Sequence, residues 1–157
     1  MMRLELNSEK MIVDLVKGKA LANDGDLTTA ILISLLTDRR ADPDDELPEY
    51  VQDADLFPAD RRGWAGDALP PVVGDRIGSR LWLLARAKQT EETRQQAIEN
   101  SHEALQWLID DGHALKIDIT AEWIIRERLQ LIVITTTLKG TFNVEVPVNV
   151  NGGSYAI

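Results

Sequence analysis

The sequence predicts an α+β fold, in which three main helices pack on a C-terminal antiparallel β-meander, with short N-terminal strands and a long ordered acidic loop. Three segments between residues 27 and 111 carry apolar residues at helical spacing, and the apolar period changes to two after Gly112. Residues 38–75, by contrast, are rich in proline and carboxylates. With 157 residues, the chain is expected to form a single domain, 1–157.

The N-terminal region mixes short apolar runs with Lys-Gly and Asp-Gly turn signals, which predicts one or two short strands with a loop. Asp26 is expected to be the N-cap of a helix over residues 27–36. Apolar residues occupy most sides of that helix, so it is predicted to be buried.

Residues 38–75 form the predicted loop, because they lack periodicity and contain five of the six prolines. A connection this long inside a compact domain is usually functional or disordered. Its apolar residues, which include Trp64, favour an ordered loop.

Two further helices are predicted after the loop. The first is a short helix over residues 77–87, which would bury Ile77, Leu81 and Leu84. The second has Thr90 as its N-cap, acidic residues in its first turn and Gly112 at its end.

The C-terminal region predicts the meander, over residues 115–150. Apolar and polar residues alternate in residues 115–121 and 141–148, and residues 128–138 are rich in β-branched side chains. Polar turns are expected near residues 126–127 and 139–140, and residues 151–157 form a short tail.

Composition excludes several classes of protein. Without cysteine there is no disulfide or thiolate metal site, and two histidines are too few for a zinc centre without carboxylate help. A net charge of −9 argues against nucleic-acid binding. The chain has no apolar run of membrane-spanning length and no secretion signal, so we expect no membrane partner and a cytoplasmic location.

Acidic residues raise two catalytic or metal-binding alternatives. Asp42, Asp44, Asp45 and Glu46 lack the glycine and the closing glutamate of an EF-hand, so a solvated acidic loop is favoured over a calcium site. A pair of carboxylates would suit a glycoside hydrolase, but the sequence does not indicate which two would face each other. No metal, cofactor or catalytic residue is assigned.

Arginines form the more informative pattern, because the tripeptide Asp-Arg-Arg occurs at both ends of the acidic loop. Scattered surface ion pairs would contribute only ~0–1 kcal/mol each. The alternative, which we favour, is a partly buried Asp/Arg network that fixes the loop around Trp64. The predicted loop brace consists of Asp38, Arg39, Arg40, Asp60, Arg61, Arg62, Trp64, Asp67, Asp75 and Arg76.

Four motifs in order resemble a known family: "ILISLLTDRRADPDDELP", "DRRGWAGD", "GDRIGSRLWLLARAKQT" and "ALQWLIDDGHA". Together they resemble the Mu-type phage baseplate family of contractile tails and prophages. That family is similar in turn to the T-even phage wedge protein that initiates the sheath, historically labelled a tail lysozyme. The resemblance implies a non-enzymatic wedge subunit, made in the host cytoplasm and carried in the virion tail baseplate.

The implied partners are other baseplate wedge proteins and, further, the sheath subunit and the tube or spike hub. Exposed sheet edges pair with strands of other chains, so residues 129–150 are expected to face the sheath. The edge candidates are Leu131, Val133, Thr135, Phe142, Val144 and Val146. A peptidoglycan-cleaving tail lysozyme, or an acidic adaptor or inhibitor unrelated to phage, are the alternative functions.

Overall fold

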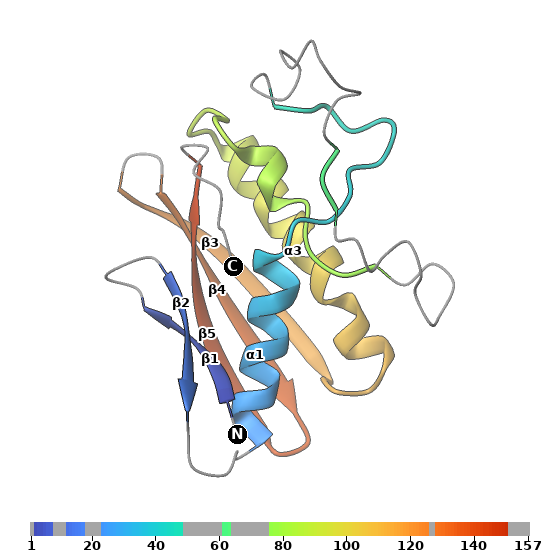
Figure 1. Cartoon of the computed structure of the whole chain (residues 1–157), viewed down its shortest axis with the longest axis vertical. Coiled ribbons are helices and arrows are strands. Elements are labelled where there is room, and N and C mark those ends of the chain that lie inside the picture. Colours follow the sequence, from blue (N-terminus) through green and yellow to red (C-terminus); the bar gives the residue numbers. More distant parts are fainter. Residues whose placement is uncertain are drawn as a thin grey trace.

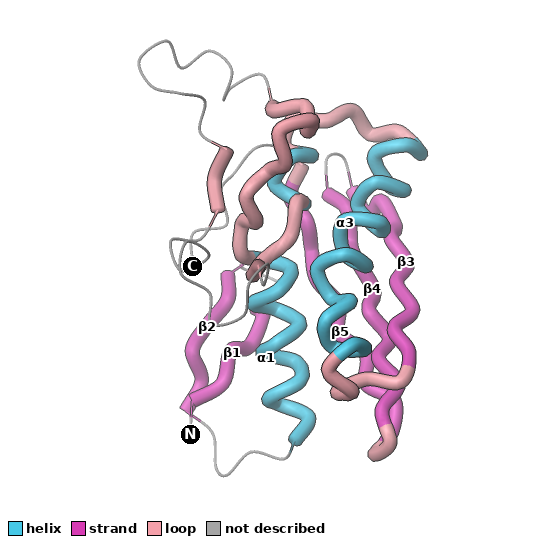
Figure 2. Tube along the Cα trace, turned by 90° about the vertical axis from the view of Figure 1, so that its right-hand side faces the viewer, coloured by secondary structure: helices cyan, strands magenta, loops and turns pink. Residues whose placement is uncertain are grey.

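The computed structural model describes residues 2–7, 12–17, 23–48, 61–63, 76–125 and 128–150. Its elements, in chain order, are β1 (Met2–Asn7), β2 (Ile12–Lys17), α1 (Asn23–Leu36), the 3-10 helix η2 (Leu81–Leu84), α3 (Glu91–Asp110), β3 (Lys116–Ile125), β4 (Arg128–Thr137) and β5 (Gly140–Asn149). Helices α1 and α3 cover one face of the sheet formed by β3, β4 and β5, and the β1–β2 hairpin lies beside α1 (Figures 1 and 2). The α+β prediction is confirmed.

One or two short strands were predicted at the N-terminus, and the structure has two. β1 and β2 pair antiparallel, with Met2 opposite Lys17 and Asn7 opposite Ile12. The hairpin is a separate two-stranded sheet and packs against α1 through β1.

Helix α1 supplies one layer of the core. Ile31, Leu32 and Leu35 are at most 2 % exposed, which confirms the predicted burial. The helix begins at Asn23, so the prediction that Asp26 is the N-cap is wrong. Acidic residues favour the first turn of a helix as well as its cap, and the residue types therefore did not fix the starting point.

The predicted helix over residues 77–87 is wrong, because only the single 3-10 turn η2 forms there. Gly78 has a φ of +98°, and a Cβ added to it would lie 2.5 Å from the carbonyl oxygen of Thr37. The backbone at Ser79 instead forms an isolated parallel bridge with Asp38. The described part of the chain therefore contains two α-helices, not three.

Helix α3 forms as predicted, from its cap to its end. The Thr90 side chain accepts a hydrogen bond from the backbone N–H of Thr93, at 3.2 Å. Gly112 follows the last turn with a φ of +75° and donates to the carbonyl of Ile109. The expected apolar stripe faces the core, since the following positions are buried: Ala97, Ser101, Ala104, Leu105 and Leu108.

The C-terminal meander is confirmed, in the order β3-β4-β5. Alternate residues of all three strands face the helices, and the register places Ile119, Val133 and Val144 side by side. Thr137 and Gly140 close the β4–β5 turn where the Lys139-Gly140 pair predicted it. Among the described helices, none has the length and apolar character to cross a bilayer.

Candidate functional site

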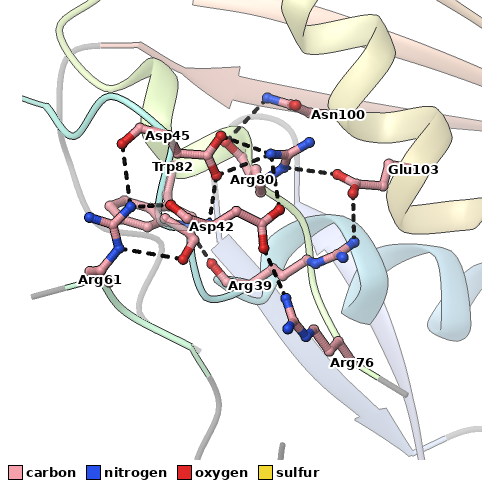
Figure 3. Close-up of polar contacts among 10 residues, drawn as sticks. Arg39, Asp42, Asp45, Arg61, Arg76, Arg80, Trp82, Asn100 and Glu103 are labelled. Atoms are coloured by element: carbon pink, nitrogen blue, oxygen red, sulfur yellow. Dashed lines mark hydrogen bonds and ion pairs between the residues drawn. The ribbon is translucent and has the colours of Figure 1, made fainter. Parts of the chain in front are cut away.

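Three chain segments meet beside α3: residues 37–45, residues 61–63 and residues 76–82 (Figure 3). The Arg39 backbone N–H donates to the Ser79 carbonyl at 2.9 Å, and the Ser79 N–H donates to Thr37 at 2.8 Å. The Ala41 N–H donates to the carbonyl of Arg61 at 3.0 Å. The described residues of the two Asp-Arg-Arg copies therefore lie side by side. We call the side chains that join these segments to each other and to α3 the arginine cluster; its members are Asp38, Arg39, Asp42, Asp45, Arg61, Arg62, Arg76, Arg80 and Glu103.

Arg80 is the central residue of the arginine cluster. Its Nη1 lies 2.8 Å and 3.0 Å from the two carboxylate oxygens of Asp45. Its Nε lies 2.9 Å from Oε2 of Glu103, which is on α3. The carbonyl of Arg80 also accepts a hydrogen bond from the Asn100 side chain, at 3.3 Å. One guanidinium thus joins the acidic loop to α3.

Glu103 receives a second guanidinium, from Arg39, at 3.0 Å between Nη1 and Oε1. The Arg39 and Arg80 side chains are only 19 % and 23 % exposed, so these ion pairs are partly shielded from water. Arg76 binds Asp42 at 3.1 Å, with both side chains more than 40 % exposed, and forms the outer rim of the cluster. Shielded charge-assisted pairs with a planar guanidinium are stronger than exposed ones.

Arg61 holds the backbone of the acidic loop. Its guanidinium donates to the carbonyl oxygens of Ala41, Asp42 and Asp45. The loop also closes on itself, because the Asp45 carboxylate accepts from the Asp42 N–H at 2.8 Å and the Asp45 N–H donates to the Asp42 carbonyl at 3.0 Å. Residues 42–45 are therefore fixed by side chain and backbone together.

Arg62 completes the cluster through an ion pair with Asp38 and a contact with Trp82. The guanidinium carbon lies 5.1 Å from the centroid of the Trp82 ring, within the range of a cation–π interaction. Trp82 is buried, and its indole N–H donates to the Arg39 carbonyl at 2.8 Å. Trp82 thus anchors the segment that carries the first Asp-Arg-Arg copy.

The charges of the cluster favour its ionised state. Burial alone would raise the pKa of Asp45, but the hydrogen bond from Arg80 and the positive charges of Arg80 and Arg61 hold this pKa below its ordinary value of 3.8. Burial likewise opposes the charge of Arg80, yet Asp45 and Glu103 raise the pKa of its guanidinium. A general acid needs a raised carboxyl pKa, so this arrangement suits a structural ion pair that holds the loop rather than proton transfer.

The structure brings several of the predicted brace residues together, since Asp38, Arg39, Arg61, Arg62 and Arg76 all make the contacts described above. Arg40 is exposed and lies 3.5 Å from the Arg62 carbonyl. The remaining four predicted residues, Asp60, Trp64, Asp67 and Asp75, lie outside the described residues.

Sequence reasoning missed Arg80 and Glu103, and it assigned Asp45 only to a solvated loop. The one available signal was weak: Asn100 and Glu103 are three residues apart on α3 and so share the flank that meets Arg80. Within the described ranges, no three His, Asp or Glu side chains converge as metal ligands.

The sheet-edge candidates lie mainly in the core. Leu131, Val133 and Thr135 are on β4, the middle strand, and are 0 % exposed. Val144 and Val146 on β5 are buried as well, and only Phe142 is partly exposed. The three β4 residues cannot form a sheet edge, because β4 is paired on both sides, and the side chains of Val144 and Val146 face the helices. A contact between the meander and a sheath stays a prediction.

Comparison with known proteins shows the family to which the chain belongs. A family model described as "Phage protein GP46" matches residues 27–141, a range that contains the whole arginine cluster. The chain belongs to this family. It is 41 % identical over 125 residues to the "Baseplate protein gp46" of Escherichia phage Mu. These 125 residues cover 79 % of this chain and 79 % of that protein.

A second relative of the GP46 family comes from a bacterial genome. The "Mu-like prophage FluMu protein gp46" of Haemophilus influenzae is 39 % identical over 109 residues, which cover 69 % of this chain and 67 % of the relative. The resemblance to the Mu-type baseplate family is therefore confirmed. Similarity to the T-even wedge protein stays a prediction.

Proposed function

We propose that this GP46-family chain is a structural subunit of a phage or prophage contractile-tail baseplate. The observation that carries the proposal is the arginine cluster, in which Arg80 and Arg39 tie the acidic loop to Glu103 on α3. The name of the phage Mu relative supports the same role.

The physical reason lies in the cost of ordering a surface on binding. Each side chain or loop that becomes fixed during assembly reduces the affinity gained from contact. The arginine cluster fixes residues 38–45 before any partner arrives, while Asp44 and Glu46 remain exposed for contact. A baseplate subunit with several neighbours benefits from such preformed surfaces.

The finer parts of the proposal concern position and partners. The chain acts as a wedge subunit that contacts other wedge proteins, and its meander offers a sheet edge to the first sheath subunits. In the described part of the sheet, β3 and β5 are the outer strands, which supports strand addition there. Contact with the tube or spike hub belongs to the same proposal, as does passage from the host cytoplasm to the tail.

A peptidoglycan-cleaving activity is the alternative that this site supports less well. Its partly buried Asp45 carboxylate has a lowered pKa and is bound by Arg80, while Arg61 donates to the Asp45 carbonyl, which is the opposite of a general acid. We expect the purified chain to leave peptidoglycan intact in a muralytic assay. Cleavage that disappears on replacing a specific Asp or Glu pair would instead identify a glycosidase.

The test of the structural role uses the phage or prophage that encodes the chain. A tagged copy should co-sediment with purified tail particles, and deletion of the gene should abolish complete tails until the wild-type chain is supplied in trans. Complete, contractile tails from the deletion mutant would contradict the proposal.

A further inference from the structure

An apolar groove lies at the end of the molecule where α1 begins, α3 ends and the β4–β5 turn closes. It encloses about 510 Å³ and shares no residue with the arginine cluster. The two helices and the β-hairpin supply most of its apolar walls, through Leu27, Ala30, Trp107, Leu108, Leu138 and Phe142.

Apolar side chains at the groove are unusually exposed to solvent. Leu138, at the tip of the β4–β5 turn, is 90 % exposed, and Leu115 beside it in the lining is 60 % exposed. Single exposed leucines are common, but apolar side chains gathered round a groove mark an interaction site. The tip of a hairpin ordinarily carries polar residues, so Leu138 is the most informative member.

The wall of the groove is already in place. The Trp107 indole N–H donates to Ser34 Oγ at 3.1 Å, and the Trp107 ring meets the His113 ring edge-to-face at a centroid distance of 5.8 Å. A tryptophan fixed in this way offers a large contact area with little further loss of side-chain freedom.

The charge at the rim of the groove indicates which chemical group a partner would place there. Lys139 lines the groove next to Leu138, and within the described residues it makes no ion pair, whereas Lys116 is bound to Asp118 at 2.7 Å. Asp110 is exposed at the α3 end. Two copies of a chain with a net charge of −9 repel each other, which disfavours a second copy as occupant.

We propose that this groove receives an apolar side chain from a different subunit of the tail, on a segment that places a carboxylate opposite Lys139. This inference rests on the proposed function, because it takes its partner from the same particle. The apolar anchor fills the space between Trp107 and Leu138, and the carboxylate fixes the direction of the segment.

A photo-cross-linking amino acid at position 138, in chains assembled into tail particles, tests the inference. The expected product joins position 138 to a segment of another tail protein that has an apolar residue next to an Asp or Glu. The same probe at Gln96, which is exposed on α3 and outside the groove, serves as the control and should not give this product. A cross-link within the chain, a cross-link to a second copy, or none at all would overturn the inference.

Substitutions give an independent readout. Leu138→Asp should lower incorporation into tails about tenfold, since burial of a leucine at an interface is lost, and Lys139→Glu should lower it a few-fold. Gln96→Glu, which also adds one negative charge at an exposed position, is the matched control and should incorporate normally. Because Leu138 is 90 % exposed, circular dichroism should show Leu138→Asp folded as the wild type.

Wild-type incorporation of Leu138→Asp would contradict the groove inference alone. If the wild-type chain itself were missing from tail particles, the proposed function would fail and this inference with it.

Discussion

Arg80 joins two carboxylates that are distant in the sequence, Asp45 in the acidic loop and Glu103 on α3. Its side chain is 23 % exposed, so removal leaves the partly shielded Asp45 carboxylate without its arginine and leaves Glu103 with Arg39 alone. We expect Arg80→Ala to lower the free energy of unfolding by ~1–3 kcal/mol in urea denaturation. Arg80→Lys keeps the charge but loses the planar fork, and it should recover only part of this loss.

Arg76→Ala is the matched control for that substitution. Arg76 contacts the same loop at Asp42, but its side chain is 44 % exposed and makes this one described ion pair. The expected change in unfolding free energy is within about 0.5 kcal/mol. Equal losses for the two variants would mean that Arg80 is an ordinary surface arginine.

Asp45 gives the molecule a pH dependence whose sign follows from its lowered pKa. A carboxylate with a folded-state pKa below the ordinary value of 3.8 stabilises the fold above that value, and the contribution is lost as pH falls through the folded-state pKa. Urea unfolding from about pH 6 to about pH 3 should therefore decline less steeply in Asp45→Asn than in the wild type. Parallel curves would contradict a stabilising role for the Asp45 charge.

The residue types predicted that the site would be ionic, but not which side chains would pair with each other. Asp45 and Arg80 are 35 residues apart, and Arg80 and Glu103 are 23 residues apart. Spacing along the chain carries no signal for such pairs, because they meet only after the loop folds back on α3. The repeated Asp-Arg-Arg tripeptide did indicate a contact, since Arg62 of the second copy pairs with Asp38 of the first.

At the scale of elements, Gly78 decides how the chain enters η2. Its φ of +98° and the 2.5 Å distance from an added Cβ to the Thr37 carbonyl oxygen leave no room for a side chain. Gly78→Ala should destabilise the fold by more than ~2 kcal/mol, because the backbone pairing of Ser79 with Thr37 and Arg39 must open.

Gly112→Ala separates steric clash from backbone conformation. Gly112 also has a positive φ, of +75°, but an added Cβ would meet nothing within 4 Å. Its cost should be only ~1 kcal/mol, as measured by thermal or urea unfolding. A Gly78→Ala loss no larger than the Gly112→Ala loss would contradict the close approach at Thr37.

Elements with strong local signals were predictable. The alternation in residues 115–121 and 141–148, with the β-branched run at 128–138, predicted the meander, and Thr90 and Gly112 marked the limits of α3. The helix predicted over residues 77–87 failed because a tertiary contact at Gly78 overrides local helix propensity. The edge candidates on β4 failed because alternation identifies the buried face of a strand but not its place in the sheet.

At the scale of the whole molecule, two kinds of interaction stabilise the structure. The apolar core between α1, α3 and the meander provides the bulk of the stability, with Ile31, Leu105 and Leu131 fully buried. The arginine cluster adds the attachment of irregular segments to that core. Stiffness of those segments is the property that the proposed baseplate role needs.

Amide hydrogen exchange at Arg39, Ala41 and Ser79 tests this claim most directly, because their N–H groups donate across the three joined segments. In the wild type, these amides should be protected well above the level of free loop amides. In Arg80→Ala they should exchange markedly faster, while those of β4 remain protected. Wild-type exchange at these three amides as fast as in an unstructured peptide would show that the arginine cluster does not hold the loop.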